Sequence, residues 1–129
     1  MYLGGLCLIT DRTVCRRSYE DMVRMILEAG ARCVQYRDKE GSRRSLYRNA
    51  LTLRSISRKF NAVFIVNDHS DIALAADADG VHLGQEDLPM QKARQILGKD
   101  RLIGLSTHTI EQALRAQASG ADYIGFGPI

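Results

Sequence analysis

Short apolar runs recur along the chain at intervals of roughly twenty residues, and stretches with a helical pattern of apolar positions lie between them. The runs lack the sustained alternation of a half-exposed strand, so they are typical of strands buried on both faces of a parallel sheet. Six such strands are predicted, at residues 6–10, 33–37, 63–67, 80–83, 102–106 and 123–127.

The intervening stretches carry the start and end signals of helices. Ser18 is followed three residues later by Asp21, which resembles a capping box, and Gly30 is a typical helix end. Pro89 suits a first helical turn, because that turn leaves its N–H groups unpaired. The five predicted helices begin at Ser18, Ser42, Ser70 or Asp71, Pro89 and Thr109, and end near Gly30, Phe60, Ala75, Gly98 and Gly120.

A strict alternation of strand and helix indicates parallel strands joined by right-handed crossovers. An open doubly wound sheet and a barrel both fit that description, but the regular short repeat favours the barrel, and no G-x-G-x-x-G follows the first strand. We therefore predict one α/β domain of the (β/α)₈ barrel type over residues 1–129. Six strands are two fewer than a closed barrel has, so we expect an incomplete barrel with open edges that could support self-association.

Composition and charge exclude several classes of protein. The chain has 129 residues and a net charge of +3, and 45% of its residues are hydrophobic, which is typical of globular domains. The early apolar run at 6–9 is too short to cross a bilayer and no basic residue precedes it, so we expect no membrane partner. The basic residues are best explained as a solvated helix face rather than a nucleic-acid site. They are Arg43, Arg44, Arg48, Arg54, Arg58 and Lys59.

Three cysteines, Cys7, Cys15 and Cys33, fit no metal-ligand spacing. Cys7 and Cys33 lie inside apolar runs, where a free cysteine behaves as a small buried hydrophobe. Unpaired cysteines of this kind are typical of a reducing compartment, so we expect a cytoplasmic protein.

Polar residues follow the second predicted strand, at the end where parallel barrels carry their chemistry. Alternation along an extended chain puts Gln35, Arg37 and Lys39 on one side. A guanidinium and an ammonium on the same side can clamp a diphosphate. Asp38 and Glu40 lie alongside, so a solvated cluster of surface ion pairs is the alternative.

Two aspartates follow the third and fourth predicted strands. Asp68 and Asp87 would lie on adjacent loops at the same end of the barrel, where two carboxylates with water and phosphate oxygens suit Mg²⁺. The neighbouring Asp71, Asp77 and Asp79 are expected to be structural, with Asp71 at a helix start.

The fifth predicted strand ends in Ser106, which could donate a hydrogen bond to a phosphate oxygen. Three histidines, His69, His82 and His108, have wide and irregular spacing that resembles no local zinc motif. We expect His82 to be a hydrogen-bonding residue at a strand end.

Five stretches in this order resemble the thiamine phosphate synthase family. They are VQYRDK at 34–39, VND at 66–68, ADGVHLGQEDLP at 78–89, IGLSTHT at 103–109 and GADYIGFGPI at 120–129. The resemblance implies a transferase of thiamine biosynthesis, which joins a hydroxymethylpyrimidine diphosphate to a thiazole phosphate and releases pyrophosphate. It also implies roles for site residues. Asp68 and Asp87 would hold Mg²⁺, and the residues that would hold the pyrimidine diphosphate are Gln35, Arg37, Lys39, Asn67 and Ser106.

The family's pattern continues beyond Gly-Pro-Ile at 127–129 with a loop carrying Thr and Lys and with two further βα units. We therefore expect this chain to carry the pyrimidine diphosphate and metal half of the site. Two alternatives stay open: an inactive or partial ligand-binding remnant of the family, and a thiazole tautomerase-like barrel in which His108 would shuttle protons.

Overall fold

The computed structural model of the chain describes residues 3–128. Strands and helices alternate throughout, and the six strands form one sheet in the order β1-β2-β3-β4-β5-β6. In chain order the elements are β1 (Cys7–Ile9), α1 (Tyr19–Glu28), β2 (Cys33–Tyr36), α2 (Arg43–Lys59), β3 (Val63–Asn67), α3 (Ser70–Ala75), β4 (Gly80–Leu83), α4 (Met90–Leu97), β5 (Leu102–Thr107), α5 (Ile110–Ala118) and β6 (Tyr123–Phe126).

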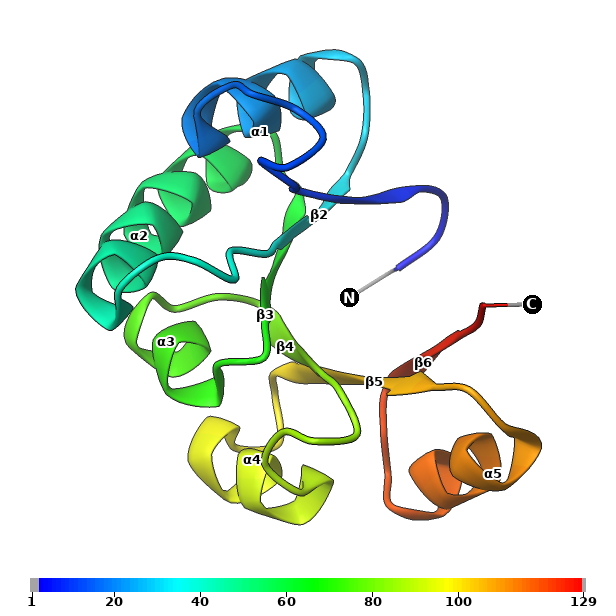
Figure 1. Ribbon diagram of the computed structural model, residues 1–129. Coiled ribbons are helices and arrows are strands. Elements are labelled where there is room, and N and C mark those ends of the chain that lie inside the picture. Colours follow the sequence, from blue (N-terminus) through cyan, green and yellow to red (C-terminus); the bar gives the residue numbers. More distant parts are fainter. Residues whose placement is uncertain (1–2, 129) are drawn as a thin grey trace.

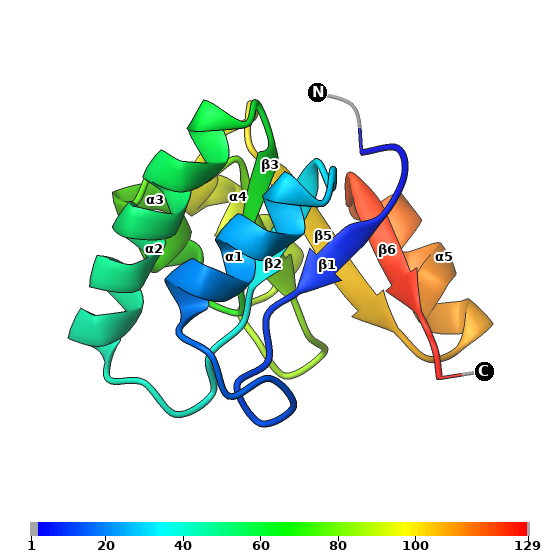
Figure 2. The same cartoon turned by 90° about the horizontal axis from the view of Figure 1, so that it is seen from above.

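All neighbouring strands are parallel, so their carboxyl ends meet at one edge of the sheet. The sheet curls, and the helices lie outside it on the convex side (Figures 1 and 2). This curled half-barrel confirms the predicted α/β architecture of the (β/α)₈ type, and each predicted strand differs from the observed one by at most one residue at either end. Ile129, the last residue of the motif at 120–129, lies outside the described residues.

Alternation along the strands separates the core from the concave face. Val34, Phe64 and Val81 are fully buried and belong to the cluster that packs the sheet against its helices. The residues between them, such as Gln35 and Ile65, are buried on the other face of the sheet. Burial on both faces explains why the sequence of these strands shows unbroken apolar runs.

Side-chain caps fix the starts of three helices as the sequence predicts. The Ser18 hydroxyl accepts a hydrogen bond from the Asp21 amide at 3.1 Å, and Thr109 accepts one from the Gln112 amide at 3.1 Å. Ser42 caps α2 in the same way. Each cap satisfies one amide that the first helical turn leaves without a partner.

One predicted helix start needs correction. Pro89 precedes α4 instead of lying in its first turn, because its ψ of 143° is extended. α3 begins at Ser70, which is the first of the two predicted starts, and its N-cap residue His69 makes no side-chain cap hydrogen bond. Asp71 therefore lies inside the first turn of α3, where a carboxylate interacts favourably with the helix dipole.

Asp79 and Asp71 make the structural contacts that the sequence analysis expects of them. Asp79 starts the segment that leads into β4, where its carboxylate accepts two hydrogen bonds from Arg54 at 2.6 and 2.9 Å and one from the Phe64 amide at 2.8 Å. Arg54 is only 14% exposed, so the expectation of a fully solvated basic face is wrong at this position. Asp71 pairs with Arg43.

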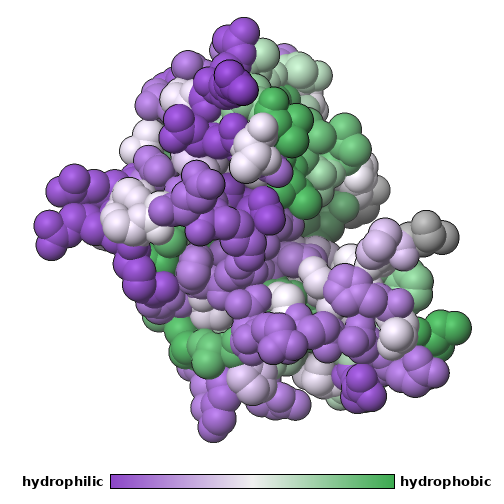
Figure 3. Space-filling view, in the orientation of Figure 1, coloured by the Kyte–Doolittle hydropathy of each residue, from purple (hydrophilic) through white to green (hydrophobic). Residues whose placement is uncertain are grey.

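The outermost strands β1 and β6 each pair with one neighbour among the described residues. Cys7 is exposed because β1 is an edge strand, which corrects the expectation of a buried thiol, whereas Cys33 on β2 is buried as expected. Hydrophobic side chains gather beside α1 and β1 (Figure 3), where Ile9, Val14 and Met25 are exposed around a groove of about 430 Å³. None of the described helices has both the length and the apolar character needed to cross a membrane.

Candidate functional site

Three charged side chains meet at the carboxyl ends of β2, β3 and β4. The Lys39 ammonium contacts the Asp68 carboxylate, although 29 residues separate them in the chain. Asp68 is 15% exposed, and Lys39 is 53% exposed. Burial raises the pKa of Asp87, and the neighbouring Asp68 carboxylate raises it further. The structure thus brings together Lys39, Asp68 and Asp87, as their positions after consecutive strands predict.

A tight turn orients the Asp68 side chain. Its φ is +68°, in the left-handed region that aspartate tolerates better than most residues. The His69 amide donates to the Asn67 carbonyl at 2.9 Å across this residue, and the Asp68 amide donates to the His82 carbonyl at 2.8 Å. A three-residue turn with positive φ is strained, and such strain is concentrated at functional sites.

Asp87 is held by the loop that follows β4. Its carboxylate accepts a hydrogen bond from the Gly84 amide at 2.6 Å, and its own amide donates to the Gly84 carbonyl at 3.3 Å. This loop closes on itself and presents the carboxylate toward Asp68. The Gly84 hydrogen bond favours the ionised form, but burial and the second carboxylate outweigh it and leave the pKa of Asp87 raised.

A cation would stabilise this pair of carboxylates, because the Asp68 carboxylate helps to raise the pKa of Asp87. Within residues 3–128, no three His, Cys, Asp or Glu side chains gather to hold a metal ion. The donor set is therefore two hard oxygen ligands, which fits Mg²⁺ completed by water and phosphate oxygens and does not fit a structural zinc site.

Arg37 lies at the rim on the other side of β2. Its guanidinium pairs with Asp11 at 3.6 Å, and its backbone is tied to the Thr10 hydroxyl, which accepts from the Arg37 amide at 2.9 Å. The loop after β1 therefore positions this residue. Asp11 and Thr10 were not found from the sequence; their place directly after the first strand is the signal that could have identified them.

Gln35 and Asn67 project from the strands themselves. Gln35 is 5% exposed, and Asn67 is partly buried beside His82 in the strand register. Among the described residues, neither side chain has a hydrogen bond to Lys39, Asp68 or Asp87. Both belong to the same end of the sheet, but the structure does not join them directly to the charged cluster.

Ser106 belongs to a network that crosses the concave face. Its hydroxyl lies 2.8 Å from Nε2 of His82, whose Nδ1 lies 3.1 Å from the Tyr123 hydroxyl. Burial lowers the pKa of His82, so the imidazole is neutral and one ring nitrogen accepts a hydrogen bond while the other donates. Gln85 donates to the Ser106 carbonyl at 2.7 Å. His82 is thus the expected strand-end hydrogen-bonding residue. The sequence did not identify Tyr123, two strands away.

Asp38 organises the loop between β2 and α2. Burial alone would raise the pKa of Asp38, but hydrogen bonds from the Glu40 and Gly41 amides hold it below its usual value. These amides donate at 3.0 and 2.9 Å, so Asp38 is a loop-holding residue and not a member of a solvated ion-pair cluster.

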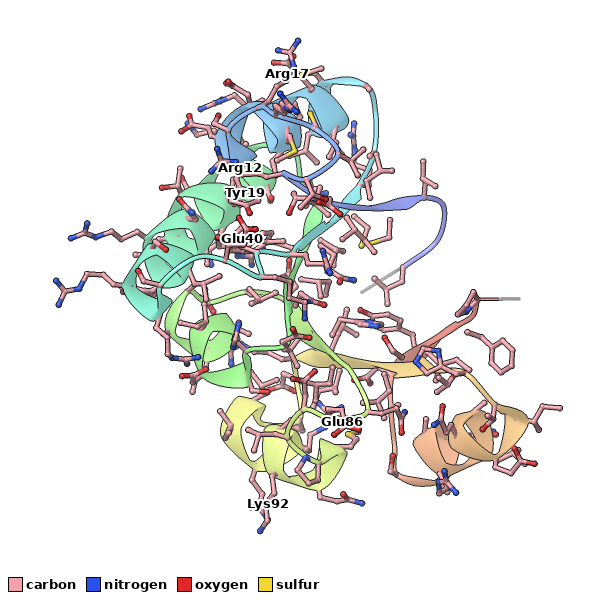
Figure 4. All side chains as sticks on the ribbon, viewed as in Figure 1. Arg12, Arg17, Tyr19, Glu40, Glu86 and Lys92 are labelled. Atoms are coloured by element: carbon pink, nitrogen blue, oxygen red, sulfur yellow. The ribbon has the colours of Figure 1, made fainter. Side chains whose placement is uncertain are left out.

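A second hollow of about 570 Å³ lies beside that loop. Arg12, Tyr19 and Glu40 gather around it between α1 and the loop (Figure 4). The Arg12 guanidinium lies 5.5 Å from the centre of the Tyr19 ring, which is a cation–π arrangement. Its lining includes Asp38 and Glu40 of the loop after β2 but none of Lys39, Asp68 and Asp87.

His108 stands apart from the charged cluster. Its Nδ1 contacts the Gly127 carbonyl, and its amide donates to the Gln112 side chain at 2.7 Å. It is exposed at the start of α5. These contacts are those of a residue that ties a helix start to the end of β6.

Comparisons with known proteins identify relatives of this chain. A family model described as thiamine monophosphate synthase matches residues 6–129. A thiamine-phosphate synthase from Lawsonia intracellularis is 49% identical over 98% of this chain and 58% of its own length. One from Synechococcus sp. strain CC9605 is 52% identical over 96% of this chain and 34% of its own length.

A solved structure gives the same result. Thiamine phosphate pyrophosphorylase from Pyrococcus furiosus superposes with a TM-score of 0.89 and 42% identity, over 95% of this chain and 59% of that chain. The chain spans about half the length of the curated relatives it matches, for example 55% of a thiamine-phosphate synthase from Dictyoglomus turgidum.

Proposed function

This chain belongs to the thiamine monophosphate synthase family, and on that premise we propose that it carries the pyrimidine diphosphate and magnesium half of a thiamine phosphate synthase site. The reaction is the transfer of a hydroxymethylpyrimidine group from its diphosphate to a thiazole phosphate, with release of pyrophosphate. It would make the protein a transferase of thiamine biosynthesis with small-molecule substrates.

The cluster of Lys39, Asp68 and Asp87 carries this proposal. A lone ammonium beside two partly buried carboxylates is a poor structural ion pair, because one carboxylate is left without a cation. A divalent cation and an anionic ligand would complete it. Asp68 and Asp87 would hold Mg²⁺, which would supply charge neutralisation to the departing pyrophosphate.

The chain's own cations would act on the same leaving group. Lys39 and Arg37 both follow β2 at its carboxyl end, where Lys39 contacts Asp68 after β3 and Arg37 pairs with Asp11 after β1. When the bond between the methylene carbon and the diphosphate oxygen breaks, the electron pair stays on pyrophosphate, and positioned cations stabilise that charge. The aminopyrimidine stabilises the carbocation until the thiazole nitrogen captures it. No protein nucleophile is required.

Ser106 and Gln35 would orient the substrate. The Ser106 hydroxyl is held by neutral His82 at 2.8 Å, so it can present a defined donor or acceptor to the pyrimidine diphosphate. Gln35 is buried on the same face of the sheet and offers an amide to the pyrimidine. Asn67, which precedes Asp68, would extend this polar lining.

Binding of Mg²⁺ with inorganic pyrophosphate tests the proposal. Isothermal titration calorimetry of the 129-residue chain should show pyrophosphate binding that depends on Mg²⁺. Asp68→Asn should weaken it more than about tenfold, since even outer-shell changes at metal sites cost that much. Asp71→Asn is the matched control, because Asp71 is 62% exposed and pairs with Arg43 outside the cluster.

A second pair of variants tests the cations. Lys39→Ala should weaken pyrophosphate binding, whereas Lys92→Ala should not, because Lys92 projects from α4 away from the sheet (Figure 4). Formation of thiamine phosphate is then assayed with both substrates. Binding without product would identify a ligand-binding half-site. The proposal is wrong if wild type shows neither Mg²⁺-dependent binding nor turnover while circular dichroism shows a folded chain.

We further propose a cytoplasmic location and self-association. The first is supported by three cysteines without a disulfide among the described residues. The second is supported by the edge strands β1 and β6, which leave Ile9 and Phe126 exposed beside unpaired backbone groups. A second copy of the chain would cover these edges, and sedimentation velocity would show a dimer that Ile9→Lys disrupts.

A further inference from the structure

Two cysteines face each other across the first pair of strands. Cys7 of β1 is the register partner of Cys33 of β2, and their Sγ atoms are 2.8 Å apart. This separation is inside the van der Waals contact of two unbonded sulfur atoms. Neighbouring strands lie about 4.8 Å apart, which is within the Cα separation that a disulfide spans.

The two thiols differ in environment. Cys7 is exposed on the edge strand, and Cys33 is buried. Because the Cys33 thiol donates a hydrogen bond to the Cys7 sulfur, the pKa of Cys7 is lowered and the pKa of Cys33 is raised. An exposed sulfur with thiolate character is the usual attacking group in thiol–disulfide exchange, and a second thiol within contact distance resolves the product.

We propose that Cys7 and Cys33 are a modification site that a low-molecular-weight disulfide, such as oxidised glutathione, converts into a reversible intrachain disulfide. The Cys7 thiolate attacks the reagent, breaks its S–S bond and releases one reagent thiol. Cys33 then attacks the Cys7 sulfur, forms the Cys7–Cys33 bond and releases the second reagent thiol. Two protein thiols lose two electrons and two protons, and the reagent gains them.

The bond would join the strands beneath the candidate site. Gln35 follows Cys33 by two residues and therefore lies on the same face of the sheet. Ile9 of β1 is the register partner of Gln35. Thr10, directly after β1, holds the Arg37 backbone. The oxidised link would fix β1 to β2 just below these contacts, at an edge where β1 has only three residues.

Mass spectrometry of the oxidised chain tests this site. The protein is equilibrated with oxidised glutathione, alkylated and digested with trypsin without reduction. Cleavage after Arg12, Arg16, Arg32 and Arg37 places Cys7, Cys15 and Cys33 on three different peptides. The expected product is a cross-linked pair of the peptides that contain Cys7 and Cys33, and dithiothreitol should separate it again.

Cys15→Ser is the matched control and should leave the cross-link unchanged, while Cys7→Ser should abolish it. Cys7 is exposed, so its replacement by serine does not threaten the fold. Oxidation should raise the Tm of wild type and of Cys15→Ser by roughly 5–10 °C, because the link closes a loop of 26 residues, and should leave Cys7→Ser unchanged. A persistent glutathione adduct, a link to Cys15, a link between two chains or unreacted thiols would each overturn the proposal.

Discussion

Removing the Asp79 carboxylate should destabilise the fold more than removing an exposed charged side chain. Asp79 accepts two hydrogen bonds from Arg54, at 2.6 and 2.9 Å, and a third from the Phe64 amide at 2.8 Å. Both charged side chains are only 14% exposed. Asp79→Ala therefore leaves a buried guanidinium and a buried strand amide without their acceptor.

The geometry sets the size of the effect. Breaking a buried ion pair by removing one partner costs about 3–5 kcal/mol, against a total stability of roughly 5–15 kcal/mol for a domain. Among the described residues the buried Nε of Arg54 has no hydrogen-bond partner, so loss of the Asp79 carboxylate would leave the whole guanidinium group unpaired. We expect Asp79→Ala to lower the free energy of unfolding by about 3–4 kcal/mol.

Two further aspartate and glutamate variants calibrate this value. Asp122 precedes β6 as Asp79 precedes β4: it accepts from the Ile103 amide at 2.8 Å and pairs with Arg94, but the two side chains are 36% and 26% exposed. Asp122→Ala should cost less than Asp79→Ala. Glu20→Ala breaks a pair that is 48% and 43% exposed and should cost about 0.5 kcal/mol.

Urea unfolding followed by circular dichroism at neutral pH measures all three variants. The expected order of destabilisation is Asp79→Ala, then Asp122→Ala, then Glu20→Ala, with unchanged m-values. Arg54→Met combined with Asp79→Ala should recover part of the loss, because it removes the stranded charge. A cost below about 1 kcal/mol for Asp79→Ala would refute the reasoning from burial.

Other variants test the caps, the concave face and the carboxylate pair. Ser18→Ala should cost about 1 kcal/mol in thermal unfolding, through loss of the α1 cap. Gly104→Ala should cost about 1–3 kcal/mol and shift the near-ultraviolet signal of Tyr123, because a Cβ there would lie 2.1 Å from that ring. Folding raises the pKa of Asp87, so this group's contribution to stability is lost as pH rises through its pKa in the folded chain. Asp87→Asn should therefore raise Tm at neutral pH but not at acid pH, and should lose Mg²⁺-dependent pyrophosphate binding.

The strand positions could be predicted because burial on two faces leaves a local signal. Val34 and Gln35 are adjacent and both buried, one in the core and one on the concave face. Such a strand must be short, apolar and bounded by helix caps, and every one of these marks is visible within a few residues. The helix starts at Ser18 and Thr109 follow from equally local hydrogen bonds.

Contacts between segments that are distant in the sequence could not be predicted, because nothing in the local sequence marks them. Arg54 lies in a basic stretch that suggests solvent, but the strand register places Asp79 within reach of it. Cys7 lies in an apolar run that suggests burial, but an edge strand has a neighbour on one side only. β5 lies between the strands of Tyr123 and His82. The Tyr123 hydroxyl still reaches His82 across it, because Gly104 of β5 has no side chain to block the ring.

The alternation of the sheet also explains why the site can be tested separately from the fold. The outward residues, such as Phe64 and Val81, are fully buried against the helices and carry the apolar core. The charged cluster of Lys39, Asp68 and Asp87 lies beyond the strand ends and contributes mutual repulsion between its carboxylates. Replacing these carboxylates should therefore remove ligand binding without removing core contacts. Loss of pyrophosphate binding in such a variant would report on the site itself.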